Sequence, residues 1–225
     1  METLKTGINE AKVLVRCFAE LNLPLSRLAQ FTRRKRMPRT KLLVLCIAMA
    51  LLAVGVASAQ TYSSDFKVDY FANANTAGAP DATVRMDNPG TAGGGICADI
   101  FVFDSAEEMS ECCSCYLSPD DLRTLSVNGD LTANPGNGVT VTGGVIKVLS
   151  TTYVGSCPAP TGGLTLTYEV KGWTTHVQNS TSTITETAMQ DADLSSKEFN
   201  TLEWNCKSIH AVDSGRGICT CGTGS

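Results

Sequence analysis

Eight cysteines constrain the folding of this chain more than any other feature. They are Cys97, Cys112, Cys113, Cys115, Cys157, Cys206, Cys219 and Cys221. An even number of cysteines in an exported domain indicates disulfide bonds. Cys112 and Cys113 are adjacent and point to opposite sides of an extended chain, so they do not readily bridge each other. We therefore expect Cys97, Cys157 and the tail with Cys206 to converge on residues 112–115.

Charge divides the chain into two unlike parts. Residues 1–60 carry ten lysines and arginines against three acidic residues, whereas residues 61–225 carry eight against nineteen. A basic front followed by an acidic body is typical of a targeting segment that precedes an exported domain. The acidic balance of the body argues against nucleic acid as a partner, because phosphates demand basic patches.

An apolar run of fifteen residues, 42–56, lies between the basic residues of 39–41 and the small residues Ala57-Ser58-Ala59. These three parts predict a signal peptide over 37–59, with cleavage before Gln60 and a secreted or periplasmic product. The alternative is an uncleaved membrane anchor, because the uncharged run of eighteen residues from 42 to 59 just reaches spanning length.

Residues 1–36 form an upstream extension before the predicted signal peptide. Signal peptides normally begin a few residues before their basic region, and Met37 would be an ordinary start. We therefore expect Met37 to be the true initiator and residues 1–36 to result from a misplaced start codon. The alternative is a long cytoplasmic n-region whose positive charge is Arg33-Arg34-Lys35-Arg36.

The remaining segment, 60–225, has the length of a single domain. Leu, Ile, Val and Phe make up about a fifth of it, so disulfides must supplement a thin core. Patterns of alternation and turn residues predict strands. The predicted strands are Ala82–Met86, Ile96–Phe103 in a central position, Arg123–Val127, Val139–Thr142, Val145–Ser150, Leu164–Val170, Trp173–Gln178 and Thr181–Thr187. The last two are expected to pair as a hairpin around Asn179-Ser180, Asn128-Gly129-Asp130 predicts a hairpin-type turn after Arg123–Val127, and Asn134–Gly138 predicts another turn.

Other segments give weaker or different signals. Gln60–Asp81 is read as a loose arm or a first edge strand, and Asp104–Glu111 as one helical turn capped by its first residues. Ser195 with Glu198 forms a capping box, and an apolar face runs from Phe199 to Ile209. The sequence thus predicts a mainly β, antiparallel sandwich with one short C-terminal helix, stapled by disulfides after an N-terminal signal segment.

Four stretches carry a resemblance to a known group of proteins. They are ICADIFVFDSAEEMSECCSC, DLRTLSVNGDLTANP, GGVIKVLS and GRGICTCG. Together they resemble exported eight-cysteine bacterial proteins of acidobacterial type, to which no function is assigned. The likeness extends from about Met86 to Gly222 and implies a recurring exported domain. It implies no activity, cofactor or binding site.

Two kinds of metal site are open from the residue types. If they stayed reduced, Cys112, Cys113, Cys115, Cys219 and Cys221 could bind copper(I) or zinc as thiolates. Against this, the paired C-x2-C spacings of zinc sites are absent, and export favours oxidation of the cysteines. Clustered carboxylates could hold calcium, either Asp191 with Asp193 or Asp104 with Glu107, Glu108 and Glu111. No calcium-loop motif is present, so a solvated acidic surface is the preferred interpretation of the carboxylates.

No recognisable motif for hydrolysis surrounds either histidine, so no catalytic residue is assigned. His176 is expected on the outer face of a strand with Thr174 and Gln178, and His210 at a helix end where a cation suits the dipole. Trp173 and His176 are the possible ligand-facing residues. The other aromatics that could serve a carbohydrate or partner surface are expected in the core: Tyr153, Tyr168 and Trp204.

These observations favour an exported, non-catalytic envelope or extracellular protein that acts by binding or by structure. Its ligand is unknown, and a cell-surface or carbohydrate partner is compatible with it. A metal-binding envelope protein with a copper or zinc thiolate site is the alternative, and an enzyme of unrecognised type comes third. No cofactor is expected.

Overall fold

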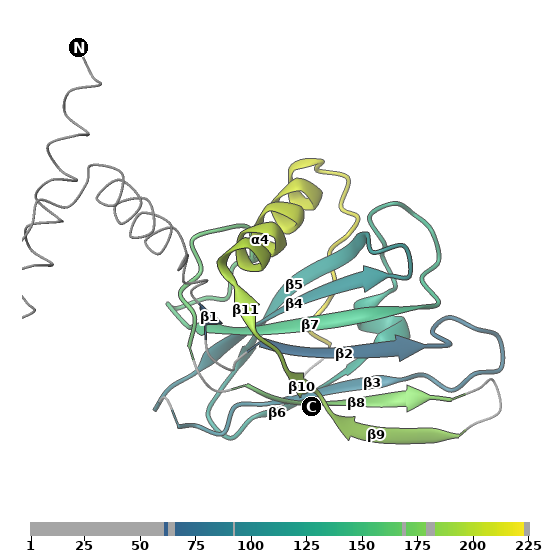
Figure 1. The fold of residues 1–225 in the computed structure, drawn as a ribbon, viewed down its shortest axis with the longest axis horizontal. Coiled ribbons are helices and arrows are strands. Elements are labelled where there is room, and N and C mark those ends of the chain that lie inside the picture. The colour runs from purple at the N-terminus through teal and green to yellow at the C-terminus, as the bar shows by residue number, and fades with distance from the viewer. Residues whose placement is uncertain (1–60, 63–65, 92, 168–169, 179–182, 223–225) are drawn as a thin grey trace, which may run out of the picture. The chain divides into compact units, whose positions relative to one another are not determined.

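The structure is a computed structural model that describes residues 61–62, 66–91, 93–167, 170–178 and 183–222. These belong to one compact unit, residues 59–225. Two antiparallel sheets face each other across a hydrophobic core, and helix α4 lies on the outer face of the larger sheet (Figure 1). The predicted sandwich is confirmed, whereas the predicted signal peptide and the extension before it lie outside the described residues.

The larger sheet has five strands in the order β10-β2-β7-β4-β5. Their bounds are Gln190–Asp191, Phe66–Ala72, Gly143–Thr152, Ile96–Asp104 and Met109–Leu117. β4 occupies a central place between β7 and β5, as its apolar character on both faces predicts. Ala98, Ile100 and Val102 face the second sheet and are fully buried, while Phe101 is fully buried on the opposite face.

The smaller sheet has four strands in the order β6-β3-β8-β9. Their bounds are Leu122–Ser126, Thr83–Asp87, Lys171–Val177 and Ile184–Ala188. This confirms the predicted strand near Ala82 and the predicted pairing of the segments around Trp173 and Thr187. After β9 the chain enters the larger sheet through Met189, whose side chain is buried in the core against Gly172. The continuous segment from β9 through Met189 to β10 therefore connects the smaller sheet to the larger one.

A third layer lies outside the larger sheet. Helix α4, Ser196–Ala211, follows the two-stranded sheet of β1, Thr61–Tyr62, and β11, Leu194–Ser195. The Ser195 hydroxyl accepts a hydrogen bond of 3.1 Å from the Glu198 backbone N–H, which confirms the predicted cap. Leu202 and Cys206 are fully buried against Phe101 and Leu149, so the helix gives the larger sheet a second core.

Four disulfide bonds link the layers. They are Cys97–Cys157, Cys112–Cys206, Cys113–Cys219 and Cys115–Cys221. The cluster at 112–115 is bonded outward to the helix and to the tail, as expected. The expectation for Cys97 and Cys157 was wrong, because these two bond to each other and tie the loop after β7 to the start of β4. All four bonds have an end on β4 or β5.

Three other local predictions were wrong. Residues 104–111 form a hairpin turn and the start of β5, in which the Asp104 carboxylate accepts hydrogen bonds from the backbone of Ala106 and Glu108. Residues 60–81 contain β2, a full strand inside the larger sheet rather than at its edge. The turn after Arg123–Val127 is a π-helical turn, Val127–Leu131, rather than a hairpin.

Two predicted strands are not found among the described residues. Of the segment 164–170, the structure describes 164–167 and 170, which form one bridge, from Leu166 to Thr151, and no strand. The reason is that β2 already pairs with β7 up to Leu149, so only the last residues of β7 are free to bond a further segment. Val139–Thr142 is likewise irregular, and β7 begins only at Gly143.

Candidate functional site

Trp173 and His176 lie on opposite faces of β8, so they do not form one site. Trp173 is half-buried and pairs with Arg85, whose neighbours Val84 and Met86 point into the core. His176 is only 3% exposed, which shows that its predicted position on the outer face was wrong. The polar alternation of β8 was read with the faces reversed.

His176 can be buried because polar side chains of neighbouring strands lie next to its imidazole ring. Its Nε2 lies 2.7 Å from the Thr187 hydroxyl and 3.5 Å from a carboxylate oxygen of Asp69, and its ring stacks on Tyr70 with centroids 4.3 Å apart. This arrangement fixes the ring between the sheets. His210 lies elsewhere, in the last turn of α4 as predicted, next to the Cys112–Cys206 bond.

The predicted carboxylate clusters are dispersed. Asp191 forms an ion pair with Lys67, and Asp104 caps the hairpin turn after β4. Glu107 and Glu108 are exposed, whereas Glu111 is fully buried on the core side of β5. Within the described residues these carboxylates therefore do not gather into one cation site.

Two carboxylic acids, Asp99 and Glu111, are fully buried, which the sequence analysis did not predict. Burial raises the pKa of Asp99 to about 7, although its carboxylate accepts a 2.7 Å hydrogen bond from Thr151. Burial also raises the pKa of Glu111 to about 7, against the effect of a 2.7 Å hydrogen bond from the Asn134 backbone N–H. Only the alternation of β4 and β5, which places both residues inside, could have indicated this.

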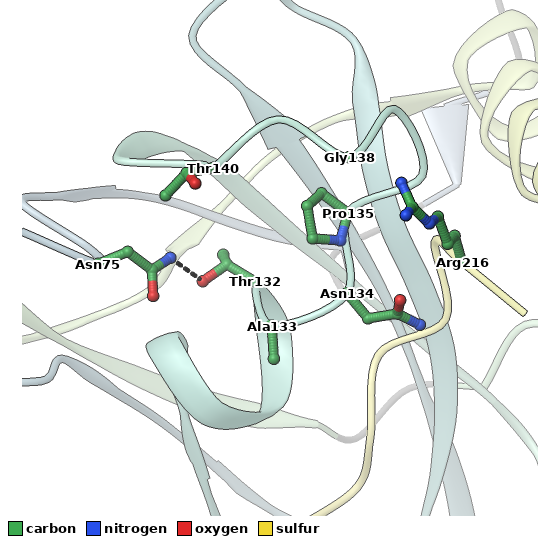
Figure 2. A pocket seen from close by; sticks show the side chains of 8 residues that line it. All are labelled: Asn75, Thr132, Ala133, Asn134, Pro135, Gly138, Thr140 and Arg216. Atoms are coloured by element: carbon green, nitrogen blue, oxygen red, sulfur yellow. Dashed lines mark hydrogen bonds between the residues drawn. The ribbon is translucent and has the colours of Figure 1, made fainter.

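A polar hollow of about 350 Å³ opens near Glu111, and Figure 2 shows the residues that line it. Arg216 stands at one end, beside Pro135 and Gly138, and Asn75 and Thr140 stand at the other. The complete lining is Asn75, Thr132, Ala133, Asn134, Pro135, Gly138, Thr140 and Arg216. The volume falls within the usual range of small-ligand pockets.

The walls of this hollow are held by backbone and side-chain hydrogen bonds between distant segments. Asn134 receives one from Gly217 at 2.7 Å, and Gly217 in turn accepts one from Cys112 at 2.9 Å. Asn75 donates to the Thr132 hydroxyl and to the Val141 carbonyl, both at 2.9 Å. The hollow is thus built before any ligand arrives, which lowers the entropic cost of binding.

Arg216 gives the hollow its charge. Of the arginines in the described ranges, Arg85 and Arg123 face carboxylates, and Arg216 has none within ion-pair distance. Gly138, at φ +72°, lets the guanidinium lie against the backbone, because a Cβ atom at this position would overlap Nη1 of Arg216. A free guanidinium with a rigid fork of donors suits carboxylate or phosphate groups.

Trp204 is the largest exposed aromatic side chain among the described residues, at 67%. It lies on the outer face of α4 above a shallow hollow with Lys197, Asn200 and Thr201. The expectation that it is a core residue was wrong, since the buried stripe of the helix runs through Leu202 and Cys206 instead. Tyr153 is also exposed at the surface, where its ring packs at a tilt against that of Tyr116.

No family model, curated protein or solved structure matches this chain. Within the residues described, no helix has the length and apolar character needed to cross a bilayer. The four disulfides are typical of a protein that matures in an oxidising compartment. The geometry of the sites is therefore the basis for the functional proposal.

Proposed function

We propose that this protein is an exported envelope or extracellular protein that acts by binding, and that the hollow at Arg216 is its ligand site. Export would proceed through the signal peptide at 37–59. The observation that carries the proposal is an unpaired guanidinium in a preformed polar hollow, in a chain whose other described arginines are paired. Binding sites of this kind combine a fixed cavity with a few convergent polar groups.

The lining favours a small polar ligand with one anionic group. Arg216 would bind the anion, and at the other end the Thr140 hydroxyl and the Asn75 amide oxygen would bind hydroxyl groups. The nearby Glu111 carboxyl opposes an anion little below pH 7, because burial raises its pKa to about 7 and keeps it mostly protonated there. An acidic sugar, which carries a carboxylate and several hydroxyls, uses both ends of the hollow.

Calorimetric titration with glucuronate and galacturonate tests this proposal on the oxidised protein. We expect Arg216→Gln to weaken binding of the preferred sugar acid by tenfold to a hundredfold, roughly the 1.5–3 kcal/mol of a charged hydrogen-bonded contact. Glucose, which lacks the carboxylate, should bind the unmodified protein about as weakly as the acid binds the variant.

Lys207→Gln is the matched control, since Lys207 is an exposed cation on α4, away from the hollow lining, and its loss changes the net charge equally. This control should bind like the unmodified protein. If neither acid binds the unmodified protein, or if Lys207→Gln weakens binding as much as Arg216→Gln, the proposed ligand class is wrong.

A further inference from the structure

Two short cysteine motifs run side by side in the core. Cys113-Ser114-Cys115 lies on β5, and Cys219-Thr220-Cys221 lies on the C-terminal tail. In an extended chain, side chains two residues apart share one face. Both cysteines of β5 therefore point to the tail, and they bond to Cys219 and Cys221 across Cα separations of 5.3 and 5.4 Å.

The sulfur atoms of these two bonds form one group. Those of Cys113, Cys115 and Cys221 all lie within 4.8 Å of one another, and the Cys219 sulfur is bonded to that of Cys113. A tetrahedral zinc ion with four Zn–S bonds of about 2.3 Å holds its sulfurs roughly 3.8 Å apart. Breaking both disulfides and separating the bonded sulfurs by roughly 2 Å would give this arrangement.

The structure assigns this group a second state: in the reduced protein, Cys113, Cys115, Cys219 and Cys221 form a tetrathiolate zinc site. The two C-x-C pairs differ from the usual C-x2-C spacing, but together they supply four thiolates, which is the number of ligands in a closed structural site. The site lies at the edge of the core, where Cys113, Cys115 and Cys219 are buried and Cys221 is half-buried.

Arg123 provides charge for this site. Its Nη1 donates a 2.9 Å hydrogen bond to the Cys221 carbonyl, and its Nε is buried with no hydrogen-bond partner among the described residues. Asp121 approaches the other end of the guanidinium at 3.8 Å. Four thiolates and one zinc ion carry two negative charges, and a neighbouring guanidinium stabilises them.

Conversion to the zinc form requires reduction of the Cys113–Cys219 and Cys115–Cys221 disulfides, and dithiols are the reductants. Two dithiol molecules supply four electrons and four protons to the two disulfides, and each dithiol becomes a disulfide. Zinc then binds as the four thiols ionise and release four protons. The zinc form is therefore the state of a reduced chain, and the disulfide form is the state after oxidation.

The second sulfur cluster serves as the internal comparison. Cys112, Cys206 and His210 offer two sulfurs and one imidazole, which is one ligand short of a closed site. The test therefore uses three proteins: the unmodified chain, Cys115→Ser/Cys221→Ser, and the control Cys112→Ser/Cys206→Ser. Each is reduced anaerobically with a phosphine, which gives two electrons to each disulfide and takes the oxygen of water to become the phosphine oxide, and is then desalted.

Titration with Co2+ supplies a spectroscopic readout. We expect the unmodified chain and the control to show thiolate-to-cobalt charge-transfer and tetrahedral bands that saturate at one Co2+ per chain and disappear on addition of Zn2+. The variant Cys115→Ser/Cys221→Ser should show less than a tenth of this signal. Absence of the bands from the unmodified chain, or equal bands in the variant, would overturn the assignment.

Alkylation followed by peptide mapping keeps the test decisive if the reduced chain loses structure. With Zn2+ present, the four assigned cysteines should react at least tenfold more slowly than Cys97 and Cys157. Protection spread evenly over all the cysteines would mean non-specific binding by an unfolded chain and would also overturn the assignment.

Discussion

The two sheets of this protein bury their residues by different means. The five-stranded sheet is covered on both faces, by the second sheet and by α4, and every disulfide has an end on its strands β4 or β5. The four-stranded sheet has no disulfide on its strands, and no described helix packs on its outer face (Figure 1). One sheet is stapled and the other is not.

This difference follows from how much apolar surface each segment can bury. The tail at 213–222 buries little apart from Gly217 and Cys219, so hydrophobic burial alone would hold it weakly. Two disulfides fix it to β5 instead. The four-stranded sheet needs no such help, because Val84, Met86 and Leu125 are fully buried by ordinary alternation. Two of the four disulfides therefore lie where apolar side chains are scarce.

Removal of the Cys112–Cys206 disulfide, which joins β5 to α4, is the strongest test of this difference between the two sheets. With Cys113–Cys219 intact, Cys112–Cys206 closes a loop of about fifteen residues, so Cys112→Ser/Cys206→Ser should lower the free energy of unfolding by about 3 kcal/mol. Denaturant unfolding measures this loss. Hydrogen exchange should show faster exchange in α4 and unchanged protection in β3 and β8. Equal loss of protection in both sheets would contradict the contrast.

The buried acids sharpen the contrast through pH. Both Asp99 on β4 and Glu111 on β5 have a pKa raised to about 7 by burial, whereas an unfolded carboxyl titrates near 4. The folded state therefore binds more protons, and stability falls as pH rises from about 4 to 8. Asp99→Asn should equal the unmodified protein at pH 4 and exceed it at pH 8 by about 2 kcal/mol, after relaxation reduces the full effect.

Denaturant unfolding at several pH values checks this expectation. Glu107→Gln on the same hairpin is the control, because Glu107 is exposed and meets water in both states. Its profile should follow that of the unmodified protein. A parallel profile for Asp99→Asn would show that this carboxyl does not control the pH dependence.

The sequence predicts the elements whose side-chain pattern agrees with their burial. β4 is apolar on both faces and is central, and the helix begins at the Ser195 cap, as its capping box predicts. His176 shows the limit of this method. The residues Thr174 and His176 are polar and still face inward, because Asp69 and Thr187 supply partners that only the tertiary structure reveals.

The hollow at Arg216 could be predicted only in part. The turn at 134–138 was recognised from its Asn, Pro and Gly residues, and it forms one wall. Asn75 and Arg216 come from segments 141 positions apart in the numbering, and no local pattern joins them. The disulfide pairing was likewise predictable only in part. The cysteine spacing limits which bonds are plausible, and the position of β5 in the sheet selects among these bonds.

The smallest expected effect lies on the unstapled sheet. Arg85 and Glu186 form a 3.1 Å ion pair across its outer face, with side chains 43% and 38% exposed. Water and salt screen such pairs, so Glu186→Gln should cost at most about 0.5 kcal/mol. A double-mutant cycle with Arg85→Met, measured by denaturant unfolding at low and high salt, isolates the pair. A coupling above about 1 kcal/mol that persists in high salt would show that this sheet, too, relies on a specific linkage rather than on alternation alone.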